Sequence, residues 1–186
     1  GSEMCIRDSV WLTAELDAKH RIGLVADTKF YMQANLEDRA RLDLYEYPYP
    51  VTEEKPSVIL RPEGGVVSAT AITDDERLVV IEHYLGNAEQ RLLLYEDGDI
   101  TDLTTQLTGG EKTRWNAVRF VRNDTVLVAT DFRSDVKRLA LLTLAGEFIE
   151  IPEIERIGLE FEEASWYRAT PDTYFFVNYE GYSHLY

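Results

Sequence analysis

Residues 74–104 of this 186-residue chain read DDERLVVIEHYLGNAEQRLLLYEDGDITDLT. A short acidic turn precedes an apolar, β-branched run, and a polar loop separates this run from a second apolar run that begins with Arg91. The dipeptide Asp97-Gly98 then precedes a third, alternating run. Asp-Gly between two strands is the strongest short signal for a β-hairpin. The stretch therefore predicts three antiparallel strands joined by short connections.

The same pattern recurs along the chain. Its turns share an aspartate, and the repeat steps are 48, 49 and 48 residues between Asp27, Asp75, Asp124 and Asp172. The apolar run after each turn ends in a polar residue, namely Asn35, His83, Asp131 and Asn178. One further strand is expected before each turn, at 21–25, 66–72, 115–121 and 166–169. Each repeat thus predicts four antiparallel strands.

A four-stranded unit that recurs about every 48 residues is typical of a β-propeller blade. Neighbouring blades cover both faces of the inner and middle strands, so these strands are continuously apolar, whereas the outermost strand alternates. The sequence predicts an all-β propeller fragment of about three and a half blades, at about 21–62, 66–108, 114–155 and from 163 onward. Helix should be minor, because no segment keeps a 3.6-residue apolar period, and 153–162 is predicted as a loop that leads into a strand.

Both ends of the sequence look incomplete. The fourth blade stops at Tyr186, inside its third strand, and Val10–Thr13 resembles the outer strand of a preceding blade. The first nine residues, GSEMCIRDS, match nothing later in the chain and resemble a translated sequencing adapter, so residues 1–9 are excluded from the fold prediction. They contain Cys5, the only cysteine, which leaves no disulfide framework or cysteine nucleophile and favours a cytoplasmic location.

Charge and hydropathy narrow the possible partners. The net charge is −15, from 34 acidic and 19 basic residues, and this argues against nucleic acid, because binding phosphates requires a basic face. No apolar run approaches the roughly 18 residues that span a bilayer, which argues against a membrane protein.

No motif predicts a catalytic, cofactor-binding or metal-binding residue. Gly181-Tyr182-Ser183 begins like a GxSxG nucleophile motif but has Leu185 at the second glycine, and Ser183 adjoins His184, so the segment is interpreted as a hairpin. The three histidines are dispersed, and His83 is expected to bond the backbone of an adjacent loop. Asp97-Gly98-Asp99 with Asp102 lacks the remaining ligands of a calcium loop, and a hairpin turn accounts for it.

Two sets of charged residues could take part in binding or packing. Glu160, Glu162 and Glu163 lie near Trp166 and Tyr167, and such a cluster could hold the amino terminus of a peptide, although a solvated loop between blades is the preferred interpretation. Basic residues recur at one position of the repeat and are expected to pair with carboxylates such as Glu82 or Asp131; they are Arg41, Arg91 and Arg138.

The segments TDFRSDVKRLALLTL (130–144) and YFFVNYEGYSHLY (174–186) resemble blade strands of the amino-terminal propeller in the prolyl oligopeptidase family of serine peptidases, which includes acylaminoacyl and dipeptidyl peptidases. The resemblance extends over 21–186, and TolB-type propellers share a similar blade. It implies a propeller that restricts access of short peptides to a following α/β-hydrolase domain. That domain, which carries the catalytic triad, is absent from this chain.

The resemblance therefore transfers no catalytic residue and implies no cofactor. Some dipeptidyl peptidases hold the substrate amino terminus with paired propeller glutamates; Glu162-Glu163 is the one pair to consider here, but its flanking residues do not match that motif, and it is not assigned as a site. The alternative prediction is a non-catalytic propeller, similar to TolB or WD-repeat modules, that acts as a protein-interaction scaffold.

Overall fold

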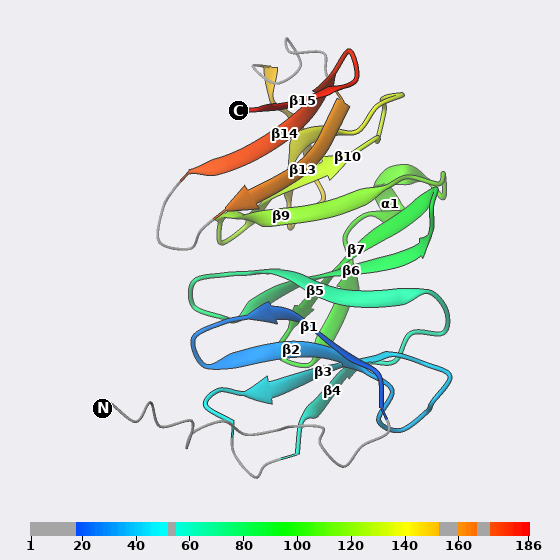
Figure 1. Cartoon of the computed structure of the whole chain (residues 1–186), viewed down its shortest axis with the longest axis vertical. Helices are drawn as coiled ribbons and strands as arrows, with labels where there is room; N and C mark the ends of the chain where they lie inside the picture. The colour runs from blue at the N-terminus through cyan, green and yellow to red at the C-terminus, as the bar shows by residue number, and fades with distance from the viewer. Residues whose placement is uncertain (1–17, 52–54, 153–159, 167–171) are drawn as a thin grey trace, which may run out of the picture.

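The computed structural model describes residues 18–51, 55–152, 160–166 and 172–186. They form four antiparallel sheets, three of four strands and one of three, with a single helix of four residues. The sheets follow one another in chain order along the long axis of the molecule (Figure 1). The predicted all-β architecture of about three and a half units is confirmed.

Within each sheet the strands lie in chain order, as successive hairpins require. The first sheet contains β1 (His20–Val25), β2 (Lys29–Ala34), β3 (Asp43–Pro48) and β4 (Ser57–Leu60). The second contains β5 (Val66–Ile72), β6 (Leu78–Gly86), β7 (Glu89–Glu96) and β8 (Asp99–Asp102), followed by α1 (Thr105–Thr108). The third contains β9 (Trp115–Arg122), β10 (Thr125–Thr130), β11 (Arg138–Thr143) and β12 (Phe148–Glu150). The fourth contains β13 (Glu160–Trp166), β14 (Thr173–Tyr179) and β15 (Tyr182–Leu185).

The first strand of every sheet carries a β-bulge. Residues of the first strand are skipped in the pairing with the second strand, and the skipped residues are Gly23, Thr70, Glu162 and, in β9, both Val118 and Val121. A bulge bends its strand and increases the local twist. A β-bulge thus recurs in every sheet, although the bulged residues share no side-chain property.

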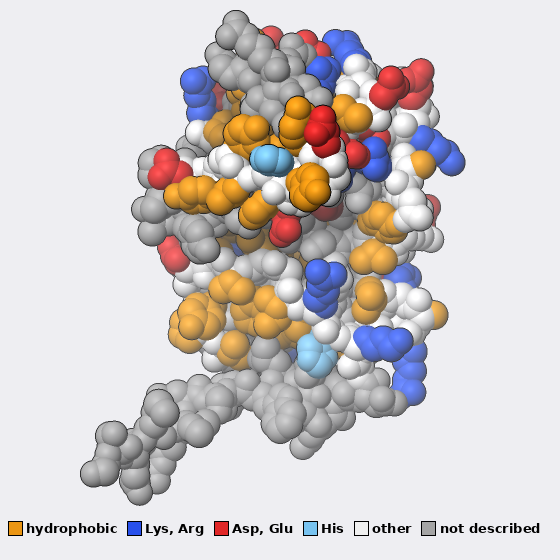
Figure 2. Space-filling view, turned by 45° about the horizontal axis from the view of Figure 1, so that its top comes forward, with side chains coloured by type: hydrophobic (Ala, Val, Ile, Leu, Met, Phe, Trp, Pro, Cys, Tyr) orange, Lys and Arg blue, Asp and Glu red, His pale blue; other side chains and the backbone are white. Residues whose placement is uncertain are grey.

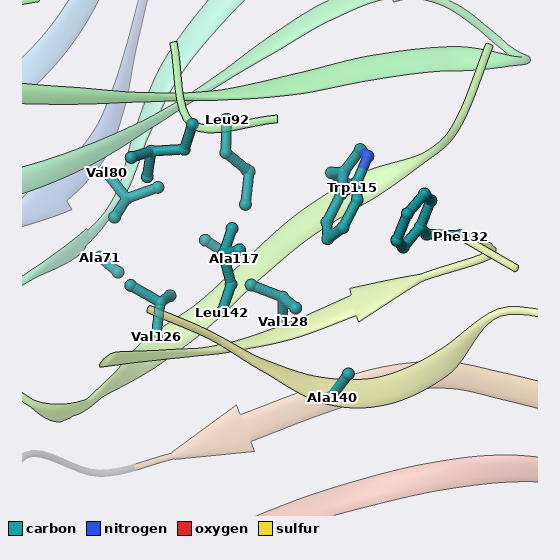
Figure 3. Close-up of a cluster of buried hydrophobic side chains, with 11 residues drawn as sticks. Ala71, Val80, Leu92, Trp115, Ala117, Val126, Val128, Phe132, Ala140 and Leu142 are labelled. Atoms are coloured by element: carbon teal, nitrogen blue, oxygen red, sulfur yellow. The ribbon is translucent and has the colours of Figure 1, made fainter. Parts of the chain in front are cut away.

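The hydrophobic core lies between the sheets. Strand β10 is buried along its whole length, because the third sheet is covered on both faces. One cluster joins the second and third sheets and includes Val80, Leu92, Trp115, Val128 and Phe132 (Figure 3). Burying one such side chain contributes about 1.5–3 kcal/mol. The prediction that middle strands are apolar because neighbours cover both faces holds for β10.

The fourth sheet is packed on one face only within the described residues. Its middle strand β14 has one buried residue, Val177, and large side chains are exposed on β14 and β15 and just after them, namely Tyr174, Tyr179, Tyr182, Leu185 and Tyr186. Figure 2 shows hydrophobic side chains at the surface of this end of the molecule.

The first strand of the fourth sheet lies earlier than predicted. We expected it at 166–169, but β13 spans Glu160–Trp166. Phe161 is buried against the third sheet, and Ala164 packs on the same cluster. Phe161 and Ala164 are three residues apart, which does not fit the two-residue period of a strand, and the bulge at Glu162 brings both to one face. The bulge is why the sequence pattern did not show this strand.

Two expectations fall on residues that are not described. Val10–Thr13 lies outside the described ranges, as do 153–159, while the strand expected at the end of that loop is present from Glu160. In the described part of the chain, no helix is long and apolar enough to cross a membrane.

Candidate functional site

A charged network connects the second and third sheets. Glu82, on β6, accepts hydrogen bonds from the backbone N–H of Ala117 (2.7 Å) and from Asn116 Nδ2 (3.3 Å), both on β9. Lys137 Nζ donates to Asn116 Oδ1 at 3.0 Å. We call Glu82, Asn116 and Lys137 the Glu82 network. In this network the Asn116 amide bonds both the Glu82 carboxylate and the Lys137 ammonium group, across the junction of the second and third sheets.

Burial shifts the pKa of both charged groups of this network. Burial raises the pKa of Glu82, and the bonds from Ala117 and Asn116 and the charge of Lys137 oppose the rise in part. Burial likewise lowers the pKa of Lys137, and the nearby Arg114 adds to this effect. The position of Glu82 has a simple cause. Strand β9 pairs with β10 alone, so half of its backbone N–H groups point away from the sheet and need an outside acceptor.

The polar residues that end the second strands close loops onto their own sheets. Asn35 Oδ1 accepts from Lys19 N (2.6 Å), and Asp131 accepts from Arg114 N (2.7 Å) and Arg114 Nε (2.6 Å). His83 Nε2 lies 2.7 Å from Gly64 O. In each case the partner lies just before the first strand of the same sheet. The prediction that His83 bonds a loop backbone is confirmed, and its role is structural.

An acidic groove lies at the other end of the strands, between the first and second sheets. Its volume is about 500 Å³, and it is lined by Asp27, Thr28, Lys29, Glu46, Asp74, Asp75, Glu76, Arg77, Tyr95 and Asp97. Tyr31 donates to Glu46 (2.6 Å), which also pairs with Lys29 (3.3 Å). Six carboxylates face two cationic side chains, so the groove favours cationic groups. Among the described residues, no group of three or more His, Cys, Asp or Glu side chains could hold a metal ion.

Ser183 and His184 do not form a nucleophile–base pair. Both lie on β15, where Ser183 pairs with Asn178 and His184 with Val177, so their side chains point to opposite faces of the sheet. The His184 ring instead meets Tyr179 edge-on, at 5.7 Å between centroids. Glu180 and Gly181 have φ of 51° and 85°, as a two-residue hairpin turn requires. The predicted hairpin is confirmed.

The aspartates around Gly98 also serve the fold. Asp97 and Gly98 have φ of 48° and 99° and form the turn between β7 and β8. Asp102 accepts from Thr104 N (2.8 Å), Thr105 N (2.8 Å) and Thr105 Oγ1 (2.6 Å). Burial alone would raise the pKa of Asp102, but these hydrogen bonds outweigh it and lower the pKa. The hairpin interpretation holds, because the Asp102 carboxylate accepts hydrogen bonds from the loop that follows β8.

The recurring arginines pair with carboxylates, but not with those we expected. Arg41 Nε lies 2.5 Å from Asp43, Arg91 lies 2.6 Å from Glu89, and Arg138 lies 2.7 Å from Glu150. The expected partners are engaged elsewhere, Glu82 with β9 and Asp131 with Arg114. Glu89 and Arg91 are two residues apart on β7 and so share a face, Arg41 lies just before Asp43 at the start of β3, and Glu150 lies on the strand that pairs with β11. A carboxylate of the same sheet is therefore the partner in all three cases.

The three glutamates before Trp166 lie in strand β13, so their interpretation as a solvated loop is wrong. Glu160, Glu162 and Glu163 are exposed, and Glu162 Oε1 accepts a 3.4 Å hydrogen bond from Asn178 Nδ2. The first strands of successive sheets lie next to one another, β1 by β5, β5 by β9 and β9 by β13. The glutamates therefore lie on the first strand of the fourth sheet, which contacts the first strand of the third sheet. Tyr167 lies outside the described residues.

Solved structures decide what this arrangement of sheets is. A structure from work on two prolyl endopeptidases, and on inter-domain dynamics in their catalysis and specificity, matches 89% of this chain with a TM-score of 0.64 and 12% sequence identity. The fold is a β-propeller. TolB from Acinetobacter baumannii matches 85% of the chain with a TM-score of 0.54 and 8% identity. At these identities the similarity shows the fold alone, and each sheet can now be called a blade.

The propeller chain spans only part of each similar protein, 25% of the prolyl endopeptidase and 40% of TolB. No protein-family model matches the sequence, and no curated protein matches it. The chain is thus a propeller scaffold, and its described residues form the Glu82 network, the acidic groove and the acidic strand β13. The residues singled out from the sequence include no nucleophile–base pair.

Proposed function

We propose that this chain is the propeller portion of a serine peptidase similar to prolyl oligopeptidase, where it limits the access of short peptides to a hydrolase domain in the same protein. The observation that carries the proposal is the structural similarity to a prolyl endopeptidase, which covers 89% of this chain but only 25% of that protein. The blade sequences at 130–144 and 174–186 resemble the same family. Short peptides and a hydrolase domain in the same polypeptide are the partners in this proposal, in the cytoplasm.

The inner strand of the fourth blade suggests how the propeller would act on peptides. In a propeller the innermost strands surround a central channel. Glu160, Glu162 and Glu163 are exposed on such a strand. Exposed carboxylates attract cationic groups and can accept charge-assisted hydrogen bonds from an α-amino group. The acidic strand would therefore favour peptides with a free amino terminus over peptides with a blocked one.

The test uses the complete protein and peptides that differ only in N-acetylation. The change of Glu162 and Glu163 to Gln is expected to lower kcat/KM for the free peptide several-fold more than for the acetylated one. Glu147→Gln, a change of an exposed carboxylate at the β11–β12 turn, is the matched control. Hydrolysis that is absent from the complete protein would overturn the proposal, whereas equal losses on both peptides would overturn only the role of the two glutamates.

A second candidate function is a non-catalytic scaffold for protein interactions. The similarity to TolB, at a TM-score of 0.54, supports it, and the acidic groove between the first two blades is a surface that a basic segment of a partner could contact. The two functions differ in one property of the complete protein. A fluorophosphonate probe, which reacts with activated serines, labels a serine peptidase and does not label a scaffold.

A further inference from the structure

A small cavity lies at the junction of the second and third blades, apart from the groove and the Glu82 network. Its volume is about 20 Å³, and polar residues form most of its lining: Glu89, Gln90, Arg91, Thr104, Thr105, Thr108, Gly110, Glu111, Thr113 and Trp115. Gln90 N donates to Thr113 O at 2.9 Å, so backbone pairing holds β7 beside the segment that leads into β9. The cavity is thus part of the contact between two blades.

Two buried polar atoms belong to residues that line this cavity. Among the residues that the structure describes, neither Trp115 Nε1 nor Gln90 Oε1 has a hydrogen-bond partner. Trp115 is fully buried, with 0% of its surface exposed. A buried polar group that lacks a partner costs about 1–3 kcal/mol, which is why such groups are nearly always paired with protein or with ordered water. Both atoms therefore require a hydrogen-bond partner, such as an ordered water molecule.

The Trp115 ring is fixed and cannot turn to find another acceptor. It packs against Phe132 with 5.5 Å between ring centroids and meets Phe148 edge-on at 6.0 Å. In Figure 3 its nitrogen lies on the edge of the ring away from Val128. The hydroxyls nearby are already in use, because Thr104 Oγ1 accepts from Leu92 N (3.2 Å) and Thr113 Oγ1 donates to Glu111 O (3.4 Å).

The two unpaired atoms define the chemistry of the partner. The indole N–H can only donate and the amide oxygen can only accept, so the partner must accept from one and donate to the other. A cation cannot accept from the N–H, and an anion cannot donate to the oxygen. A cavity needs about 10–15 Å³ to hold one water molecule, which leaves little room for anything larger here. We propose that this cavity is a binding site for one internal water, which accepts from Trp115 Nε1 and donates to Gln90 Oε1.

Such a water would bridge two blades by hydrogen bonds. It links β7 of the second blade to β9 of the third, at the end of the hydrophobic cluster in which Trp115 packs. An internal water typically makes about three hydrogen bonds, and the polar residues that line the cavity offer further oxygen atoms for the third. The junction of these two blades would then rest on three kinds of contact: apolar packing, the Glu82 network and one water.

The test is an NMR measurement of cross-relaxation between water and the indole N–H protons of the ¹⁵N-labelled chain, with Trp115→Phe used to assign the Trp115 signal. We expect a water cross-peak with the sign of a long-lived bound molecule. Gln90→Met, which removes the acceptor, is expected to abolish this cross-peak, while Gln90→Glu, which keeps an acceptor, and Gln106→Met, a change on the exposed face of α1, are expected to retain it.

Three results would overturn the proposal. The first is a resolved Trp115 indole signal in the unaltered chain with no bound-water cross-peak. The second is a cross-peak that Gln90→Met leaves at full intensity in a folded protein. The third is a high-resolution crystal structure in which Trp115 Nε1 bonds directly to protein. The third result needs no variant, and the first needs only Trp115→Phe for the assignment, so the proposal can be contradicted even if Gln90→Met does not fold.

Discussion

Glu76, in the second blade, accepts a 2.5 Å hydrogen bond from the backbone N–H of Asp27, in the first blade. The same carboxylate accepts from the backbone N–H and the hydroxyl of Thr28, with the hydroxyl at 2.5 Å. Glu76 is only 8% exposed, although it lies in a turn and has a φ of 58°. One glutamate thus caps the hairpin turn of the preceding blade, and with Glu82 it places a carboxylate at each of the first two blade junctions.

Replacement of Glu76 is expected to destabilise the protein. Hydrogen bonds to a charged group contribute about 1.5–3 kcal/mol, and loss of the carboxylate leaves the N–H groups of Asp27 and Thr28 without this acceptor. Glu76→Ala should therefore lower the free energy of unfolding, measured by urea denaturation, by about 2 kcal/mol. Glu96→Ala, on the exposed end of β7, is the control and should change it little. Equal midpoints for Glu76→Ala and the unaltered protein would contradict this role.

Glu82 should respond differently to two substitutions. Glu82→Gln keeps an oxygen that can accept from Ala117 N while removing a buried charge, so the free energy of unfolding should change by less than about 1 kcal/mol. Glu82→Leu leaves Ala117 N and Asn116 Nδ2 unpaired and should lower it by about 2–3 kcal/mol. Urea denaturation of the three proteins measures both effects. If the two variants were equally destabilised, the hydrogen bonds would not be what Glu82 contributes.

Asp102 should make stability depend on pH in the acid range. Its pKa in the folded protein lies below the ordinary value of 3.8, so the unfolded chain binds a proton more readily. The stability that Asp102 contributes is complete above its ordinary pKa and is lost as the pH falls through the lowered folded value. Asp102→Asn lacks this dependence, so the difference in Tm between the variant and the unaltered protein should shrink from pH 7 to pH 3. A constant difference would contradict the assignment.

Two adjacent glycines provide a matched pair. A Cβ on Gly65, which has a φ of 74°, would overlap the carbonyl oxygen of Tyr84, whereas a Cβ on Gly64 would meet nothing within 4 Å. Gly65→Ala is expected to cost about 1–3 kcal/mol of stability, because the backbone must shift or adopt a strained conformation. Gly64→Ala should be nearly neutral. Thermal unfolding of both variants distinguishes them, and similar Tm values would show that the β4–β5 connection adapts.

This 186-residue chain alone is expected to lack peptidase activity. Ser183 and His184 point to opposite faces of the same sheet, so neither can activate the other. Hydrolysis of peptide p-nitroanilides should not exceed the buffer background, and Ser183→Ala should leave the signal unchanged. Turnover by the purified chain that a serine-directed inhibitor abolishes, and that Ser183→Ala removes, would refute this assignment.

The local features of the fold were visible in the sequence because they depend on neighbouring residues. The turn at Asp97-Gly98, the alternation of β8 and the polar ends such as Asn35 each follow from backbone chemistry within a few residues. The β-bulges were not visible, because Gly23, Thr70, Val118 and Glu162 share no side-chain property. Strand β13 was misplaced for the same reason.

The contacts between blades could not be predicted from the sequence either. Glu76 reaches residues 48 and 49 positions earlier, and Glu82 reaches residues 34 and 35 positions later. Nothing local distinguishes these glutamates from the many exposed carboxylates of an acidic chain. The arginines were assigned the wrong carboxylates because the repeat identified equivalent positions, whereas pairing depends on which strand lies alongside. The unpaired atoms of Gln90 and Trp115 likewise emerge only when two blades pack together.

The coding sequence downstream of Tyr186 tests the central claim most directly. If the chain is the propeller of a serine peptidase, the reading frame should continue through the remaining blades into about 200–300 residues of α/β-hydrolase domain. That domain should contain a strand, a GxSxG turn and a helix, followed by the aspartate and histidine of a catalytic triad. A reading frame that ends soon after the last blade would contradict the peptidase proposal and would favour the second candidate function, a scaffold for protein interactions.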